Sequence, residues 1–119
     1  MSWSLKLSAL STQDPSRLSW FLSGTILAGG GWVLSRTFSE REVRMSFEFE
    51  RSGCIEIYTA LISAGLELSH DSHQRLTELC QCTRNQRQPV PGETVGIELD
   101  VLARTQTKSA RLLEQLETT

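Results

Sequence analysis

Two hydrophobic periods alternate along the first 69 residues of this 119-residue chain. Four segments have the period of two that is typical of half-buried strands: residues 3–10, 32–39, 43–50 and 66–69. Two segments have the period of 3.6 that is typical of amphipathic helices: residues 15–28 and 54–64. The pattern therefore predicts the element order strand, helix, strand, strand, helix, strand.

The first predicted helix has clear boundaries. Asp14 is a good N-cap residue, Pro15 suits the first helical position, and the glycines 29–31 end the helix. Four side chains fall on the face that we expect to lie on the sheet: Leu18, Phe21, Leu22 and Thr25. Trp20 and Leu27 fall on roughly the opposite face, either as scattered surface residues or under a partner or the C-terminal segment.

The segment 43–50 is the clearest strand. Val43, Met45, Phe47 and Phe49 alternate with polar residues, so we expect Phe47 and Phe49 in the core. The segment 32–39 alternates less cleanly. Apolar residues on both of its faces at positions 32–34 predict a strand end that is buried on both sides.

The chain continues beyond residue 69 with three further predicted elements. They are a helix over about 71–84, a strand over 95–101, and a final short helix that Thr107 caps and that carries Leu112, Leu113 and Leu116. We therefore expect one domain over 1–119, with a core at 3–69 and an extension at 70–119 that packs on the core or on a partner subunit.

This order of elements predicts an α+β fold. A βαββαβ chain of this kind forms a ferredoxin-like sandwich, in which both helices cover one face of an antiparallel sheet. The additional helix, strand and helix then form a C-terminal extension of that sandwich.

Composition and charge narrow the class of protein. Apolar content of 39% and charged content of 22% are typical of a soluble globular domain, and the net charge of −2 argues against a nucleic-acid partner. The three cysteines Cys54, Cys80 and Cys82 are an odd number without the spacing of a disulfide framework. Because residues 1–10 do not resemble a signal peptide, we expect reduced thiols and a cytoplasmic location.

One uncharged segment tests this interpretation. Residues 18–35 contain no charge and approach the length of a membrane span. The three consecutive glycines 29–31 would break such a helix in the middle, whereas in a soluble fold they end a helix and form a turn. We therefore expect no membrane segment.

Three short motifs within about residues 3–69 carry a resemblance to a known family. They are Gln13-Asp14-Pro15-Ser16 after the first strand, the glycines 29–31 before Trp32-Val33-Leu34, and residues 62–68 between the second helix and the fourth strand. Together with the βαββαβ order, they resemble the ACT domain, a small module that binds amino acids and related effectors, usually across a dimer interface.

The resemblance implies a ligand site at the start of the first helix. In the family an Asp-x-Pro-Gly turn exposes backbone N–H groups to a ligand carboxylate, whereas here Gln13 and Ser16 stand at the Asp and Gly positions. The residues that would form the site are Gln13, Asp14, Ser16, Arg17, Trp32 and Val33. Arg17 would pair with the carboxylate and Trp32 would supply an apolar wall. The alternative is that Asp14 occupies the N–H donors as an ordinary N-cap.

A metal site is not expected. Four potential ligands follow residue 69: His70, His73, Cys80 and Cys82. On one helix His73 and Cys80 lie about 10 Å apart along the axis, whereas zinc holds its ligands at about 2.0–2.3 Å. Cys82 points nearly away from the face of Cys80, which we interpret as a small core residue.

Catalytic motifs are also missing from the sequence. It contains no nucleophile elbow, no glycine-rich phosphate loop after a strand and no H-E-x-x-H motif. Four carboxylates on strands could meet on one sheet face, although such a face is usually solvated: Glu48, Glu50, Glu98 and Asp100. We therefore expect no catalytic residue and no cofactor.

These observations favour a non-catalytic module that binds an amino-acid-like effector or takes part in a regulatory interaction. Two alternatives stay open: a dimeric α+β barrel enzyme, which shares the βαββαβ order, and a purely structural dimerisation module. We expect a homodimer, because Trp20 and Leu27 need cover and the edge strands of an open sheet need pairing. A small carboxylate or amino acid is the expected ligand.

Overall fold

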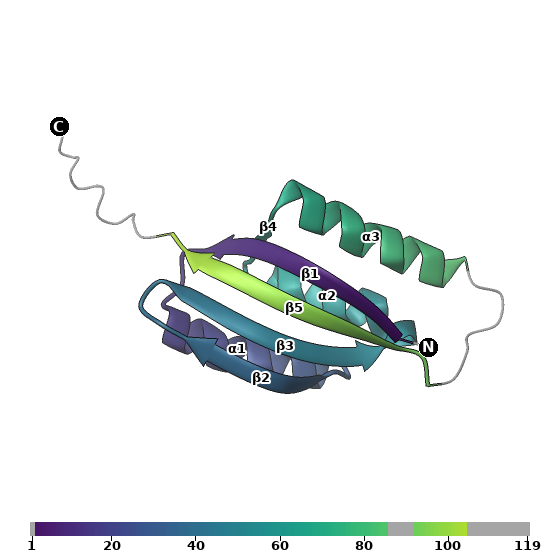
Figure 1. Cartoon of the computed structure of the whole chain (residues 1–119), viewed down its shortest axis with the longest axis horizontal. Helices are drawn as coiled ribbons and strands as arrows, with labels where there is room; N and C mark the ends of the chain where they lie inside the picture. The colour runs from purple at the N-terminus through teal and green to yellow at the C-terminus, as the bar shows by residue number, and fades with distance from the viewer. Residues whose placement is uncertain (1, 86–91, 105–119) are drawn as a thin grey trace.

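The computed structural model describes residues 2–85 and 92–104. Its elements are β1 (Ser2–Ser11), α1 (Pro15–Ala28), β2 (Trp32–Phe38), β3 (Glu42–Glu50), the short 3-10 helix η1 (Arg51–Gly53), α2 (Cys54–Ser63), β4 (Glu67–Leu68), α3 (His70–Arg84) and β5 (Thr94–Ala103). The α+β class is confirmed, and so is the predicted order of elements up to β5 (Figure 1). The predicted final helix from Thr107 lies outside the described residues.

The sheet does not have the predicted ferredoxin-like arrangement. Its strand order is β2-β3-β5-β1-β4, and β5 runs parallel to β1 and antiparallel to β3. The sheet is therefore mixed, and β5 separates the first and third strands (Figure 1). The physical reason lies in β5 itself, whose side chains Val95, Ile97, Leu99 and Val101 are all buried. A strand this apolar loses less by pairing on both sides than by lying at an edge.

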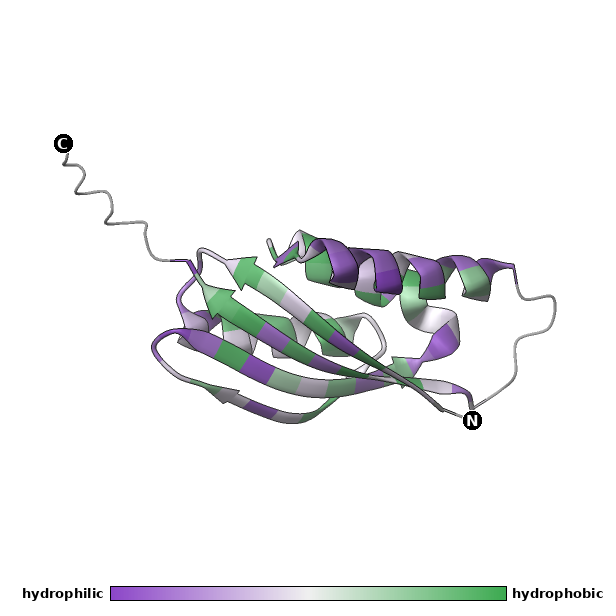
Figure 2. Cartoon of the chain, turned by 45° about the horizontal axis from the view of Figure 1, so that its top comes forward, coloured by the Kyte–Doolittle hydropathy of each residue, from purple (hydrophilic) through white to green (hydrophobic). Residues whose placement is uncertain are grey.

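Helices cover only one face of this sheet (Figure 1). On β1, β3 and β5 alternate side chains point toward the helices and are buried, while their neighbours on the other face carry most of the polar groups (Figure 2). We call the uncovered side the open face. Within the described residues nothing packs on it, and no helix there is long and apolar enough to cross a membrane.

The core lies between the helices and the covered face. Phe47 and Phe49 on β3 are fully buried, as predicted, with ring centroids 6.4 Å apart. Cys80 is buried, as its interpretation as a core residue requires. The burial of Phe47 and Phe49 confirms which face of β3 was predicted to lie in the core.

The first helix begins as predicted but is rotated relative to the expected face. Asp14 caps it, and its buried stripe is Leu18, Leu22 and Ile26. Phe21 is 51% exposed, so its predicted contact with the sheet is wrong. The reason is that Leu18, Leu22 and Ile26 are spaced by four residues and turn the helix so that Phe21 lies beside this stripe.

The prediction that the start of β2 is buried on both sides is also wrong. Trp32 and Leu34 are exposed, because β2 is the edge strand of the sheet. Its register against β3 shifts between Val33 and Ser35, so Leu34 is an extra residue in a β-bulge. Trp32 and Leu34 thus face solvent, whereas Val33 is partly buried against the core.

Candidate functional site

In the predicted ligand turn, side chains of the turn itself form hydrogen bonds with the backbone. The Asp14 carboxylate accepts a hydrogen bond from the backbone N–H of Arg17 at 3.2 Å, and the Gln13 side chain donates to the carbonyl of Ala64 at 3.1 Å. The N-cap therefore takes one of the donors that a ligand carboxylate would need. Ser16 is half-buried, and Arg17 is exposed.

The other two predicted site residues lie elsewhere. Trp32 and Val33 begin β2 after the end of α1, and this helix of 14 residues is about 21 Å long. The Trp32 indole N–H donates to the carboxylate of Glu48 at 3.2 Å. The structure thus keeps Gln13, Asp14, Ser16 and Arg17 together and does not bring Trp32 and Val33 to them.

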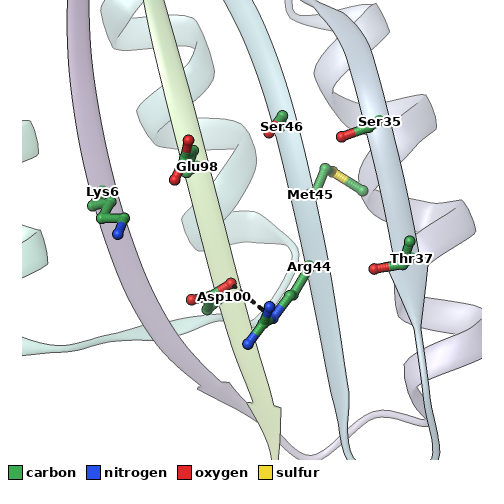
Figure 3. A pocket seen from close by; sticks show the side chains of 8 residues that line it. All are labelled: Lys6, Ser35, Thr37, Arg44, Met45, Ser46, Glu98 and Asp100. Atoms are coloured by element: carbon green, nitrogen blue, oxygen red, sulfur yellow. Dashed lines mark ion pairs between the residues drawn. The ribbon is translucent and has the colours of Figure 1, made fainter.

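A polar hollow of about 410 Å³ lies on the open face (Figure 3). It runs across β1, β5, β3 and β2, and its charged side chains are Lys6, Arg44, Glu98 and Asp100. The strand registers bring them together, because Lys6 is opposite Glu98 and Arg44 is opposite Asp100. Alternation along each strand then puts all four on the same face.

Arg44 in this hollow forms ion pairs with carboxylates, but these pairs are long and exposed. The Nε of Arg44 lies 3.7 Å from a carboxylate oxygen of Asp100 and 3.6 Å from one of Glu42. All three side chains are well exposed, so solvent screens these pairs. The hollow offers both signs of charge to a bound molecule, without a buried polar anchor.

The four predicted strand carboxylates do share the open face, but they do not form one cluster. Glu98 and Asp100 line the hollow, whereas Glu48 is opposite Gly96 and Glu50 opposite Thr94, toward the other end of β5. Residues 94–100 of a strand span about 20 Å. Within the described residues no group of three or more His, Cys, Asp or Glu side chains could hold a metal ion.

An exposed apolar surface follows α1 and the edge strand β2. Its members are Trp20 (64% exposed), Leu27 (69%), Leu34 (58%) and Phe38 (50%), and we call them the α1–β2 surface. Trp20 and Leu27 are seven residues apart, which puts them on the same side of the helix two turns apart. Their exposure agrees with the prediction that they face away from the sheet.

Arg36 joins the two elements of this surface. Its guanidinium lies 3.6 Å from the ring centroid of Trp20, and it donates a hydrogen bond of 3.0 Å to the hydroxyl of Ser23. Cation–π contact of this kind is favourable and orients the indole. The charge of Arg36, which is the only charge on β2, is thereby drawn toward α1 and away from the outer edge of the sheet.

Sequence reasoning missed the hollow and the exposure of Trp32 and Leu34 at the start of β2. The polar alternation of Ser4, Lys6 and Ser8 with apolar residues was visible in the sequence, but nothing local shows that Lys6 and Arg44 line one hollow. That depends on β5 lying between their two strands.

Comparison of the chain with models of known protein families, with curated proteins and with solved structures gave no match.

Proposed function

We propose that this protein is a non-catalytic interaction module that forms a homodimer through its α1–β2 surface. The observation that carries the proposal is the exposure of four large apolar side chains, each at least half exposed, on one helix and the neighbouring edge strand. Large apolar patches of this kind on soluble domains mark interaction sites more often than chance.

The backbone of β2 supports pairing with another strand. β2 ends the sheet, so the side away from β3 presents backbone N–H and C=O groups. Natural proteins protect such edges with Lys, Pro, charge or very short strands. β2 has seven residues, no Lys and no Pro, and its single charge on Arg36 is turned toward Trp20.

At the opposite edge of the sheet β4 pairs with only Ala9 and Leu10 of β1, and the start of α3 contacts β1 beyond it, where the Ser8 N–H donates to the hydroxyl of Ser72. β4 contains only two residues, and its Glu67 forms an ion pair with Arg104. Short length and charge are the usual protective devices. The contrast between the two edges favours β2 as the interface.

A second copy of this chain is the occupant that fits best. An antiparallel pair of β2 strands around a two-fold axis would join the two sheets and put α1 beside its counterpart. The pairing would run along residues 35–38, where the ladder is regular beyond the bulge at Leu34. This segment contains one charge, that of Arg36, whose guanidinium stacks on Trp20 of its own chain, and the apolar side chains of the surface would meet their counterparts across the axis.

Packing of two open faces against each other, as in a dimeric α+β barrel enzyme, is less favourable. The open face carries Lys6, Arg44 and Glu98 among other charged groups. Their burial would remove them from water, and the desolvation of charges is costly unless every group is paired. This argument supports side-by-side association over a closed barrel.

The experiment is light scattering of the full chain at about 100 µM protein. We expect a mass of about 27 kDa, twice the 13.3 kDa of one chain. Leu34→Lys and Trp20→Glu should each shift the mass toward the monomer, because they place charge in the interface. Leu102→Lys is the matched control, since Leu102 is exposed to a similar extent as Leu34 but lies on β5. A monomeric wild-type chain, or dimers of both variants, would refute the proposal.

Binding of an amino-acid-like effector is a second candidate, and the hollow on the open face favours it. A zwitterion could meet Arg44 or Lys6 with its carboxylate and Glu98 or Asp100 with its ammonium group. The Gln13–Arg17 turn stays the alternative location for such a ligand.

A thermal-shift series with the amino acids separates the two locations, because a ligand stabilises the state that binds it. Arg44→Ala should abolish the shift if the hollow binds, and Arg17→Ala should abolish it if the turn binds. Arg75→Ala on α3, which removes an exposed ion pair with Asp71, is the control. No shift with any amino acid would end this candidate and leave the interaction module untouched.

A further inference from the structure

Two buried cysteines face each other between α2 and α3. The sulfur atoms of Cys54 and Cys80 lie 2.7 Å apart, although the residues are 26 positions apart in the chain. Non-bonded heavy atoms pack at about 3.5–4.0 Å, whereas the sulfurs of a disulfide are about 2.05 Å apart. Both residues are free cysteines. Their sulfur–sulfur distance is therefore shorter than a packing contact and longer than a disulfide bond.

We propose that Cys54 and Cys80 form a redox-active dithiol site, which a peroxide converts to a disulfide that joins α2 to α3.

Access to the site is one-sided. Cys54, the first residue of α2, is completely buried. Cys80 is 5% exposed and lines a surface hollow of about 290 Å³ together with Ile55, Tyr58, Thr77, Gln81 and Arg84. A molecule as small as hydrogen peroxide can approach the sulfur of Cys80 from this hollow. Cys80 is therefore the thiol that reacts first, and Cys54 is the resolving thiol behind it.

The electrostatics of the pair agree with these roles. The hydrogen bond that the two sulfurs share lowers the pKa of Cys80 by stabilising its thiolate, although burial and the carboxylate of Glu56 act in the opposite direction. The same hydrogen bond and burial raise the pKa of Cys54, which keeps the shared proton, although the nearby Arg51 acts in the opposite direction. Thiolate is the nucleophilic form, so reaction at Cys80 is favoured.

The reaction balances with one peroxide for each disulfide. The Cys80 thiolate attacks one oxygen of hydrogen peroxide, the O–O bond breaks, and Cys80 becomes a sulfenic acid while hydroxide leaves. The sulfur of Cys54 then attacks the sulfur of Cys80, the S–O bond breaks, and a second hydroxide leaves. The protons of the two thiols convert both hydroxides to water. Two thiols are oxidised by two electrons, and the peroxide is reduced to two molecules of water.

Cys82 provides the internal control. It lies two residues after Cys80 on α3 but is exposed, on another side of the helix. The short spacing of Cys80 and Cys82 is what the sequence shows, whereas the partner that the fold supplies is Cys54. Only tertiary structure distinguishes the two pairings.

The test treats the full-length native chain with hydrogen peroxide at one equivalent. We expect the intact mass to fall by two hydrogens, the number of reactive thiols after unfolding to fall from three to one, and a peptide that joins Cys54 to Cys80. The melting temperature should rise by about 10 °C on oxidation and return with dithiothreitol, because the disulfide closes a loop of moderate length.

Cysteine variants distinguish a disulfide between Cys54 and Cys80 from oxidation at other residues. Cys82→Ser should behave as the wild-type chain, whereas Cys54→Ala and Cys80→Ala should lose the fall in mass. Cys54→Ala should instead gain oxygen at Cys80. Three thiols that survive the treatment, a bond that involves Cys82, or oxygen gained by the wild-type chain without loss of two hydrogens would each overturn the proposal. Mapping of the wild-type chain decides the matter even if a core variant fails to fold.

Discussion

Single side chains in the core carry much of the stability of a small domain such as this one. Phe47→Ala removes a fully buried ring and should lower the free energy of unfolding by about 3–5 kcal/mol. Phe21→Ala, which removes a half-exposed ring on α1 outside the α1–β2 surface, is the matched control and should cost much less. Urea denaturation of both variants checks the prediction. Equal losses would mean that the faces of β3 are assigned incorrectly.

Two glycines are predicted to respond in opposite ways to an added methyl group. In Gly31→Ala the Cβ would lie 2.9 Å from the carbonyl oxygen of Glu48 and 2.9 Å from a methyl carbon of Ile26, so we expect a loss of about 1–3 kcal/mol. In Gly24→Ala, inside α1, the Cβ would meet nothing within 4 Å, so stability should rise by about 0.5–1 kcal/mol. Thermal unfolding measures both changes. A neutral Gly31→Ala would show that β3 yields at this contact.

At the scale of elements, Arg51 on η1 connects parts of the chain that lie far apart in sequence. Its guanidinium forms a buried ion pair of 3.2 Å with Glu93, donates to the hydroxyl of Thr83 on α3 at 3.0 Å, and lies 4.6 Å from the ring centroid of Trp3 on β1. One side chain thus ties α3 and the start of β5 to the N-terminal end of β1.

Removal of this side chain should therefore be costly. Arg51→Ala leaves the Glu93 carboxylate buried without its guanidinium, and we expect a loss of about 3–5 kcal/mol. Arg44→Ala, which removes exposed ion pairs on the open face, should cost less than about 1 kcal/mol. Chemical denaturation compares the two. If both variants lose a similarly small free energy of unfolding, the attraction between Arg51 and Glu93 only compensates for the desolvation of the two charges.

At the scale of the whole molecule, the position of each strand predicts how firmly its amides are protected. β5 is paired on both sides along its length and should contain the slowest-exchanging amides. β2 is paired on one side within a single chain, and dimerisation as we propose would protect its outer amides only at high protein concentration. Hydrogen exchange at two concentrations tests this. Concentration-independent exchange in β2 of a dimeric chain would place the interface elsewhere.

Local sequence patterns were enough to predict the helices and strands from β1 to β5 and part of the core. Alternation along 43–50 identified the buried side of β3, and Asp14 with Pro15 identified the start of α1. These features depend on neighbours within a few residues, because side-chain period and helix capping are local properties of the backbone. The phase of α1 was predicted only in part, since the sheet beneath the helix selects the stripe with Leu18, Leu22 and Ile26 over the one with Phe21.

Strand order, and everything that depends on it, was decided by the tertiary structure. A strand's sequence indicates which of its faces is apolar but not which strands lie beside it, so the central place of β5 between β1 and β3 was missed. The polar hollow and the contact of Cys54 with Cys80 have the same origin, because each joins residues from separate elements. Sequence by itself thus determined the elements and their polarity, whereas long-range packing of apolar surface determined which side chains meet.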